Sequence, residues 1–288
     1  MLDIATGAIV HATDLDVLEA LGDGSVDMVY VDPPFNTGRT RRGVRMRTSA
    51  DENGDRTGFA GRRYRTSTEQ LQSFVDNHGD YIGYLRPRLE ETRRVLAVHG
   101  TLYLHLDPRE SHYAKVMLDG IFGRDCFLNE IIWAYDYGAR PRRRWPAKHD
   151  VILVYVRDPR HYHFDNEAVD RIPYMAPGLV TAAKAARGKL PTDVWWHTIV
   201  PTGSKERTGY PTQKPLAIVR RALSASTRQG ALVLDWCAGS GTTGVAAKEL
   251  GRRFLLVDRS ADAVAVMRAR LGDVAGLRVC EGVGALVG

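Results

Sequence analysis

An apolar run that ends at two consecutive prolines is the feature of this chain that most restricts its fold. Residues 28–31 read Met-Val-Tyr-Val, which predicts a buried strand, and Asp32-Pro33-Pro34-Phe35 follows directly. Two prolines remove two backbone N–H donors and fix φ twice, so the strand must stop in a stiff corner. The corner carries a carboxylate, an aromatic ring and backbone carbonyls that no sheet uses. It suits a flat, amino-bearing ring, and a strand-ending turn with a surface Asp fits these four residues equally well.

A second strand that ends in an acid lies about 200 residues later in the chain. Residues 231–235 are apolar and end in Asp235, and a glycine-rich turn at 236–244 leads into a helix-forming stretch at 245–250. A glycine-rich turn between strand and helix brings backbone N–H groups close to a ligand. Asp258 ends the following strand, about 20 residues further on, where an acid can bind ribose hydroxyls.

The turn also matches a dinucleotide-binding pattern, Gly239-x-Gly241-x-x-Gly244. A dehydrogenase usually opens its chain with this unit, whereas here it stands near the C-terminus. The residues also suit a nucleoside with an anionic tail and no pyrophosphate, such as S-adenosylmethionine. A dinucleotide oxidoreductase therefore remains as an alternative at this point.

Four separated segments resemble, in this order, the amino-group DNA methyltransferases of the permuted beta class, in which the catalytic motif precedes the cofactor loop. The segments are residues 32–38, 148–155, 208–215 and 235–243. The resemblance covers most of residues 10–275. It implies a doubly wound, mostly parallel, Rossmann-like α/β sheet with a small irregular target-recognition insert.

The expected organisation is one methyltransferase domain in two halves. Residues 1–156 form the catalytic half, residues 157–205 the target-recognition insert and residues 206–288 the cofactor-binding half. Strands are expected at 4–10, 26–31, 101–106, 130–135, 151–156, 231–235 and 252–258, and helices at 15–21, 68–97, 111–122, 216–226 and 245–250. Pro87 is expected to break or kink the helix over 68–97.

The resemblance assigns the catalytic step to Asp32, Pro33, Pro34 and Phe35. Asp32 and the Pro33 carbonyl accept the two N–H bonds of an exocyclic amine, and Phe35 stacks on the base. None of the three cysteines follows a proline. The covalent Pro-Cys mechanism of 5-methylcytosine enzymes is therefore excluded.

The resemblance also implies a cofactor site for S-adenosylmethionine, with no metal. Asp258 would bind the ribose, and Thr212 and Lys214 would lie near the methionine carboxylate. Lys214 also fits a solvent-exposed helix start. The remaining cofactor-binding residues are Asp235, Trp236, Cys237, Ala238, Gly239, Ser240, Gly241, Thr242 and Thr243. In the family, the first strand often ends in Gly-Asp, and this acid helps to bind the cofactor. In this chain Asp14 stands one position later, so no cofactor-binding role is assigned to it.

Positive charge is concentrated directly after the catalytic corner. Residues 36–65 contain nine Arg and three acids, a balance of +6 that equals the net charge of the whole chain. Such a run is often a solvated loop. Here we expect residues 39–66 to be a flexible Arg-rich loop that orders on the phosphate backbone of DNA. The expected DNA-binding residues are Arg39, Arg41, Arg42, Arg45, Arg47, Arg62, Arg63, Arg140, Arg142, Arg143 and Arg144.

The expected function is site-specific methyl transfer from S-adenosylmethionine to adenine N6 of a flipped-out base. Asp32 followed by Asn36-Thr37-Gly38 resembles the adenine enzymes, whereas cytosine-N4 enzymes more often carry Ser at the first position. The alternatives are a cytosine-N4 methyltransferase and a non-catalytic DNA-binding partner subunit. An RNA substrate is also open, since basic segments bind either nucleic acid.

Composition limits the setting. The three cysteines have no metal-ligand spacing, and no apolar run approaches the ~20 residues of a membrane span. The N-terminus shows no signal peptide, so a cytoplasmic, nucleoid-associated location is expected. Expected partners are double-stranded DNA, a second copy of the chain in a homodimer, and a cognate restriction endonuclease.

Overall fold

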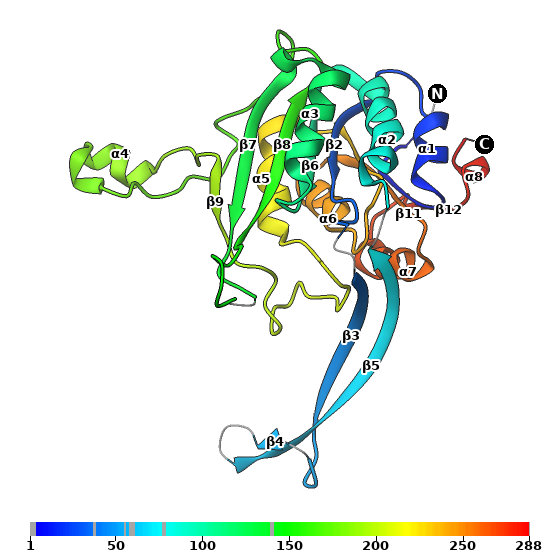
Figure 1. Cartoon of the computed structure of the whole chain (residues 1–288), viewed down its shortest axis with the longest axis vertical. Helices are drawn as coiled ribbons and strands as arrows, with labels where there is room; N and C mark the ends of the chain where they lie inside the picture. The colour runs from blue at the N-terminus through cyan, green and yellow to red at the C-terminus, as the bar shows by residue number, and fades with distance from the viewer. Residues whose placement is uncertain are drawn as a thin grey trace.

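The fold is built on a nine-stranded sheet (Figure 1). The computed structural model describes residues 4–36, 39–54, 56–57, 61–76, 79–138 and 141–287, with the backbone alone described for 39–50, 56, 66–76 and 287. The strands lie side by side in the order β12 (Arg278–Glu281), β1 (Gly7–His11), β11 (Arg253–Asp258), β10 (Leu232–Asp235), β2 (Val26–Val31), β6 (Leu96–Leu106), β8 (His149–Val156), β7 (Phe127–Ala134) and β9 (Val194–Trp196). Only the two pairs that involve β8 are antiparallel. The predicted mostly parallel α/β fold is confirmed.

Helices cover both faces of the sheet (Figure 1). One face carries α1 (Asp14–Ala20), α2 (Tyr81–Val95) and α3 (Ser111–Phe122), and the other carries α5 (Leu216–Ser226), α6 (Thr242–Glu249) and α7 (Ala261–Leu271). In β2, Val29 and Val31 join the core under the first three helices, and Met28 and Tyr30 join the core under the others. Burial on both faces explains why this strand reads as a continuous apolar run.

The sheet has a topological switch point between β2 and β10, where the connections to the next strands lead to opposite sides of the sheet. These strands are parallel neighbours, with Met28 opposite Val233 and Val29 opposite Leu234. After β2 the chain continues to β6 on one side, and after β10 it continues to β11 on the other. In an open parallel sheet, the crevice outside the strand ends at such a switch point is where ligands bind. The loops that begin at Asp32 and Asp235 both leave from this point.

An antiparallel ribbon follows the corner at Asp32–Phe35 and extends away from the body of the protein (Figure 1). It consists of β3 (Arg39–Ala50) paired with β5 (Arg63–Asp76), with the short β4 (Arg56–Thr57) against β5. The prediction of a loop over 39–66 is therefore wrong for the backbone. The reason is long-range pairing: Arg39 lies opposite Asp76, a partner that no local window of sequence reveals.

The prediction of a helix over 68–97 is wrong in its first part. β5 continues to Asp76, and α2 begins only at Tyr81. Asp80 caps α2, because its Oδ1 accepts a hydrogen bond from Gly83 N at 2.8 Å. The ladder with β3 satisfies the backbone of the preceding segment, and this tertiary pairing overrides its helical spacing.

Pro87 does not break α2, so of the two predicted outcomes the break is wrong. The helix runs through Pro87 to Val95. Leu85 and Leu89, on either side of the proline, are fully buried in the core. Their packing keeps both halves of the helix in place despite the missing hydrogen bond.

The other predicted elements are confirmed with shifts of a few residues at their ends; β1 starts at Gly7 rather than residue 4, and β6 starts at Leu96. The segment 157–205 holds a 3₁₀ turn (Pro177–Leu179), α4 (Ala182–Arg187) and β9. A 3₁₀ turn (Arg124–Cys126), α7, β12 and a terminal α8 (Gly284–Val287) were not predicted. Within the described ranges, no helix has the length and apolar character needed to cross a membrane.

The contact between β1 and β11 gives a test of the fold. Gly7 lies opposite Phe254, and a Cβ added at Gly7 would stand 2.3 Å from the Phe254 ring. Gly7→Ala is expected to lower the free energy of unfolding by about 1–3 kcal/mol, because the buried ring must move. Urea denaturation measures the change. Gly22→Ala, whose Cβ would meet no atom within 4 Å, is the control; equal stability of both variants would contradict this account.

Candidate active site

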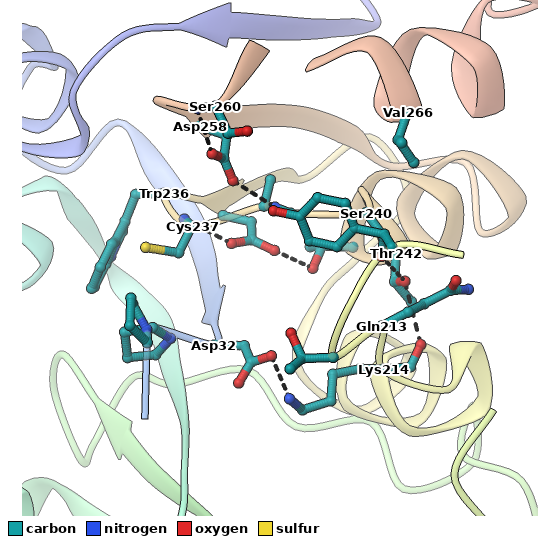
Figure 2. Close-up of a pocket in the computed structure, with 18 of the residues that line it drawn as sticks. Asp32, Gln213, Lys214, Trp236, Cys237, Ser240, Thr242, Asp258, Ser260 and Val266 are labelled. Carbon is teal, nitrogen blue, oxygen red and sulfur yellow. Dashed lines mark hydrogen bonds and ion pairs between the residues drawn. The ribbon is translucent and has the colours of Figure 1, made fainter. Parts of the chain in front are cut away.

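A cavity of about 490 Å³ opens at the switch point of the sheet (Figure 2). Its walls come from the loops after β1, β2, β10 and β11 and from the segment that precedes α5. Asp32 and Lys214 lie at one end, and Asp258 and Ser260 lie at the other (Figure 2). The cavity therefore joins the two regions that the sequence analysis assigned to catalysis and to cofactor binding.

At the first end, the Asp32 carboxylate is held from one side only. Lys214 Nζ lies 2.5 Å from Asp32 Oδ2 and 4.5 Å from the centroid of the Phe35 ring. Lys214 is 8% exposed, so this ion pair is shielded from water. The other oxygen, Asp32 Oδ1, is buried and has no hydrogen-bond partner within the described structure. A buried acceptor without a donor is costly, and a ligand N–H group would satisfy it.

The corner itself is fixed by its neighbours. Pro33 is buried, and the chain turns at Asn36 with a φ of 52°. Asn36 Nδ2 donates to Glu110 Oε1 at 2.9 Å, which ties the corner to the segment before α3. The backbone carbonyls of the corner are thus held in place next to the cavity.

A buried hydrogen-bonded chain stands behind Phe35. The His105 ring lies 5.9 Å from the Phe35 ring, between the Tyr30 hydroxyl (3.0 Å from Nδ1) and Asp150 Oδ2 (3.1 Å from Nε2). Burial acts to raise the pKa of Asp150, but hydrogen bonds from His105 and Tyr135, together with the positive charge nearby, outweigh it and hold that pKa below its usual range. Asp150 is therefore a carboxylate that fixes the His105 ring against Phe35.

At the other end, Asp258 braces the glycine-rich turn. Its Oδ2 accepts from Gly239 N at 2.8 Å, and its Oδ1 accepts from Ser260 N at 2.9 Å. Burial raises the pKa of Asp258. Gly239 has a φ of 49°, and a Cβ there would stand 3.0 Å from the Tyr210 ring, so glycine is needed for this close approach.

Asp235 lies between the two ends and is almost fully buried. Its Oδ2 accepts from Thr243 Oγ1 at 2.6 Å, and its Oδ1 accepts from Cys237 N at 3.1 Å. Burial raises the pKa of Asp235 to about 7, since these two bonds recover only part of the lost hydration. A carboxyl group with this pKa is balanced between its two charge states at neutral pH.

Trp236 and Cys237 form an apolar stretch of the wall. Trp236 is 1% exposed, and its Nε1 donates to Thr92 Oγ1 at 3.1 Å. Burial raises the pKa of the Cys237 thiol well above its usual value, so the thiol is neutral. The indole is packed into the core and fixes the backbone of the wall, and the partly buried Cys237 side chain offers an apolar contact there.

Thr242 connects the glycine-rich turn to the end of the cavity that holds Asp32 and Lys214. Its Oγ1 donates to the Lys214 carbonyl at 3.3 Å and lies 3.1 Å from Ser240 Oγ (Figure 2). Arg270 donates to the Ser240 carbonyl at 2.6 Å. Thr212, beside Lys214, has a φ of 60° and lines the cavity.

The cavity brings together almost all residues that the sequence analysis assigned to it. The four catalytic residues and every assigned cofactor residue except Gly241 line the wall. Gly241 instead stands where a Cβ would lie 2.7 Å from Met267. The sequence analysis assigned no role to the other lining residues: His11, Asp14, Tyr30, Tyr84, Tyr210, Pro211, Gln213, Val219, Arg259, Ser260, Ala261, Asp262 and Val266.

His11 and Asp14 could have been found from their position after the first strand. His11 Nδ1 donates to Glu281 Oε2 (2.8 Å) and His11 Nε2 donates to the Arg259 carbonyl (3.2 Å), and the Glu281 bond raises the pKa of His11. Asp14 receives two bonds of 2.9 Å from Arg88. Parallel strands end at one edge of a sheet, so residues after β1 must face the same cavity.

The predicted DNA-binding arginines fall into two described groups. Arg62 and Arg63 are exposed at the start of β5, and Arg142, Arg143 and Arg144 are exposed between β7 and β8. Arg39, Arg41, Arg42, Arg45 and Arg47 stand on β3, where only the backbone is described, and Arg140 lies outside the described residues.

Comparison with known sequences adds to the geometry. A model of the DNA methylase family that comprises N6 and N4 enzymes matches residues 26–268. The type II methyltransferase M.HpaI of Haemophilus parainfluenzae is 27% identical over 263 residues, which are 91% of this chain and 73% of the relative. The DNA adenine methyltransferase YhdJ of Escherichia coli K12 is 26% identical over 275 residues, 93% of this chain and 83% of the relative.

Solved structures share the fold at low sequence identity. The cytosine-N4-specific PvuII DNA methyltransferase matches with a TM-score of 0.66 and 13% identity over 94% of this chain and 88% of that one. TTHA0409 of Thermus thermophilus, solved with S-adenosyl-L-methionine, matches with a TM-score of 0.59 and 19% identity over 96% and 99%.

The pKa of Asp235 gives a test of the cavity without a ligand. An acid whose pKa rises from 3.8 to about 7 on folding favours the native state below about pH 4, and this contribution is lost as the pH rises through 7. Asp235→Asn removes the buried charge. Its free energy of unfolding is therefore expected to exceed the wild type's by about 1–4 kcal/mol at pH 8 and by progressively less toward pH 5. Chemical denaturation across this pH range measures the difference.

The control for this test is Asp193→Asn, at an exposed position. It is expected to change stability by no more than about 0.5 kcal/mol at any pH. A stability difference for Asp235→Asn that does not vary between pH 5 and pH 8 would show that the buried carboxyl does not titrate there.

Proposed function

The chain belongs to the DNA methylase family of N6 and N4 enzymes, and on that basis we propose that it transfers a methyl group from S-adenosylmethionine to N6 of an adenine flipped out of DNA. One observation carries the proposal. Asp32 Oδ1 is a buried, unpaired acceptor beside the Phe35 ring, at one end of a cavity whose other end holds Asp258. Such an acceptor fits an amino group on a flat ring.

The proposed cofactor lies along the cavity. Asp258 would bind the ribose hydroxyls, the turn around Gly239 would approach the nucleoside, and Trp236 and Cys237 would contact its adenine ring. Asp258 already accepts two backbone bonds, and each carboxylate oxygen has a further lone pair for a hydroxyl. The solved complex of TTHA0409 with S-adenosyl-L-methionine supports this choice of methyl donor.

The proposed reaction relies on positioning. The adenine amine is a poor nucleophile because its lone pair is delocalised into the ring. Hydrogen bonds to Asp32 Oδ1 and the Pro33 carbonyl would rotate that lone pair toward the methyl group. The N–C bond would form as the C–S bond of the sulfonium breaks, which leaves a neutral thioether, and the amine proton would pass to solvent through its hydrogen bond to Asp32 Oδ1. The acceptors are preset for the positive charge that develops on nitrogen.

The target base has to leave the duplex, because a methyl donor cannot reach an amine inside stacked pairs. Phe35 would then stack on the extruded base, held against the His105 ring. The ribbon and the insert at 157–205 are proposed to contact double-stranded DNA, together with the exposed arginines. A homodimer, a cognate endonuclease and a place at the nucleoid remain proposals of the same kind.

Adenine is proposed over cytosine on two grounds. Asp32 with Asn36-Thr37-Gly38 resembles adenine enzymes, and YhdJ, 26% identical, is named an adenine methyltransferase. The PvuII enzyme, which is cytosine-N4-specific, matches in fold at 13% identity. Cytosine N4 is therefore the second candidate, and product analysis separates the two.

Lys214 has a further proposed role. Its ammonium group neutralises Asp32 Oδ2 at 2.5 Å, which leaves Oδ1 directed to the substrate. We propose that Lys214 positions Asp32 and that its contact with the methionine carboxylate is secondary. The hydrogen bond from Thr242 to the Lys214 carbonyl would couple the position of Lys214 to that of the glycine-rich turn.

The direct test is single-molecule sequencing of DNA from cells that express the wild type or Asp32→Ala. The wild type is expected to leave N6-methyladenine at one short motif. Asp32→Ala is expected to lose at least about 100-fold in transfer, since it removes an acceptor of developing charge. N4-methylcytosine without N6-methyladenine would refute adenine specificity, and equal methylation by both proteins would refute the role of Asp32.

Lys214→Met tests the positioning role. If Lys214 acts through Asp32, kcat is expected to fall about tenfold or more while the Kd for S-adenosylmethionine changes little. Radiolabelled methyl transfer and calorimetry measure the two quantities. Lys248→Met, at an exposed position on α6 outside the cavity, is the control. A large rise in Kd with an unchanged kcat would assign Lys214 to the cofactor instead.

A further inference from the structure

Trp145 is the most conspicuous side chain outside the cavity. It is 95% exposed, although tryptophan is normally buried over most of its surface. It lies in the segment 141–148 between β7 and β8. The described protein core does not use this indole, so its large flat surface is available to a partner.

The surroundings of Trp145 are strongly basic. Arg142, Arg143 and Arg144 precede it and are all exposed. The chain has no acidic residue between Asp136 and Asp150. An exposed aromatic ring among arginines fits nucleic acid, where the cations contact phosphates and the ring stacks on a base.

The segment that presents Trp145 is held at its base. Lys148 Nζ donates to the carbonyls of Tyr137 (2.7 Å) and Gly138 (2.9 Å), and Tyr135 N donates to the Lys148 carbonyl at 2.9 Å. Pro146 follows Trp145 directly and restricts its backbone to extended conformations. Less freedom is then lost when the indole binds a partner.

The segment leaves the sheet at the edge where the cavity opens. β7 runs in the same direction as β2, and its last residue, Ala134, lies opposite His149. Tyr135 donates to Asp150 at 2.9 Å, and Asp150 is bonded to His105, whose ring lies 5.9 Å from Phe35. Three contacts therefore connect the base of the segment to the ring proposed to hold the flipped adenine.

We propose that Trp145 stacks on a DNA base that is exposed when the target base leaves the duplex, while Arg142, Arg143 and Arg144 neutralise nearby phosphates. This inference rests on the proposed function for its substrate. An extruded base leaves its neighbours without a stacking partner, and an indole inserted there restores that stacking. Trp145 thus favours the open form of the duplex.

A second exposed indole provides an internal comparison. Trp196 is 74% exposed at the end of β9, where it lies opposite Ala134. Its neighbour Trp195 is buried, and Arg221 lies over its ring. Because the triple-arginine run adjoins Trp145 and not Trp196, the effect is assigned to Trp145.

The experiment measures methyl transfer and binding on duplexes that contain the modified motif, with the target base either paired or mispaired. Trp145→Ala is expected to raise the KM for paired DNA roughly 5- to 100-fold. The Kd for S-adenosylmethionine should not change. The defect should shrink on the mispaired duplex, since an unpaired target base flips without help.

Salt dependence separates the indole from the arginines. Trp145→Ala should keep the slope of log K against log salt for DNA binding. Replacing Arg142, Arg143 and Arg144 together by Ala should reduce that slope by up to about 0.9 for each phosphate that is no longer neutralised. Val98→Ala, 57% exposed and near the start of β6 at the opposite edge of the sheet, is the control and should behave as the wild type.

Three results would overturn the inference. The first is an active Trp145→Ala protein with wild-type KM on both duplexes. The second is a defect found in Trp196→Ala instead. The third is a Trp145→Ala protein that binds DNA normally but changes its self-association in sedimentation, which would make the indole a protein contact. If the wild type itself methylates no DNA, the proposed function fails, and binding of a mixed-sequence duplex still decides whether Trp145 contacts DNA.

Discussion

The parallel pairing of β2 with β10 is the constraint on which the cavity depends. Met28 lies opposite Val233 and Val29 opposite Leu234, although the two strands are about 200 residues apart in the chain. This register brings the ends of both strands to one edge, and the loops that start at Asp32 and Asp235 then form facing walls. Because β2 is buried on both faces, a one-residue shift of its register would exchange Met28 and Tyr30 with Val29 and Val31 between two differently packed cores, and the core therefore fixes the geometry of the site.

Three carboxyl groups that share one cavity lose favourable hydration. Asp32, Asp235 and Asp258 all line the cavity, and burial raises the pKa of Asp235 and of Asp258. Lys214 neutralises Asp32, and backbone N–H groups support Asp258. Asp32 Oδ1 still lacks a hydrogen-bond donor within the described structure, and the carboxyl groups give the cavity a negative potential. The cavity therefore favours a cationic ligand, which agrees with a sulfonium methyl donor.

Sequence reasoning succeeded where the deciding physics is local. The stiff Asp-Pro-Pro corner, the glycine-rich turn and the strand ending at Asp258 are each encoded within a few residues, and the shared-edge rule for parallel strands then predicts that they meet. It failed where a distant partner decides. β5 became a strand because β3 pairs with it, and α2 continues through Pro87 because Leu85 and Leu89 are packed in the core. The same shared-edge rule would have placed His11 at the cavity, because it ends β1, whereas its hydrogen-bond partners at β11 and β12 are visible only in the fold.

The ribbon of β3 and β5 begins and ends at the same place. Arg39, at its start, lies opposite Asp76, at its end. The segment therefore closes on itself and adds nothing to the ladder of the main sheet. It can be shortened, lengthened or exchanged for another without displacing Asp32 on one side or α2 on the other. If the ribbon contacts DNA as proposed, such changes would alter the length of duplex that the protein covers and would leave the residues of the cavity unchanged.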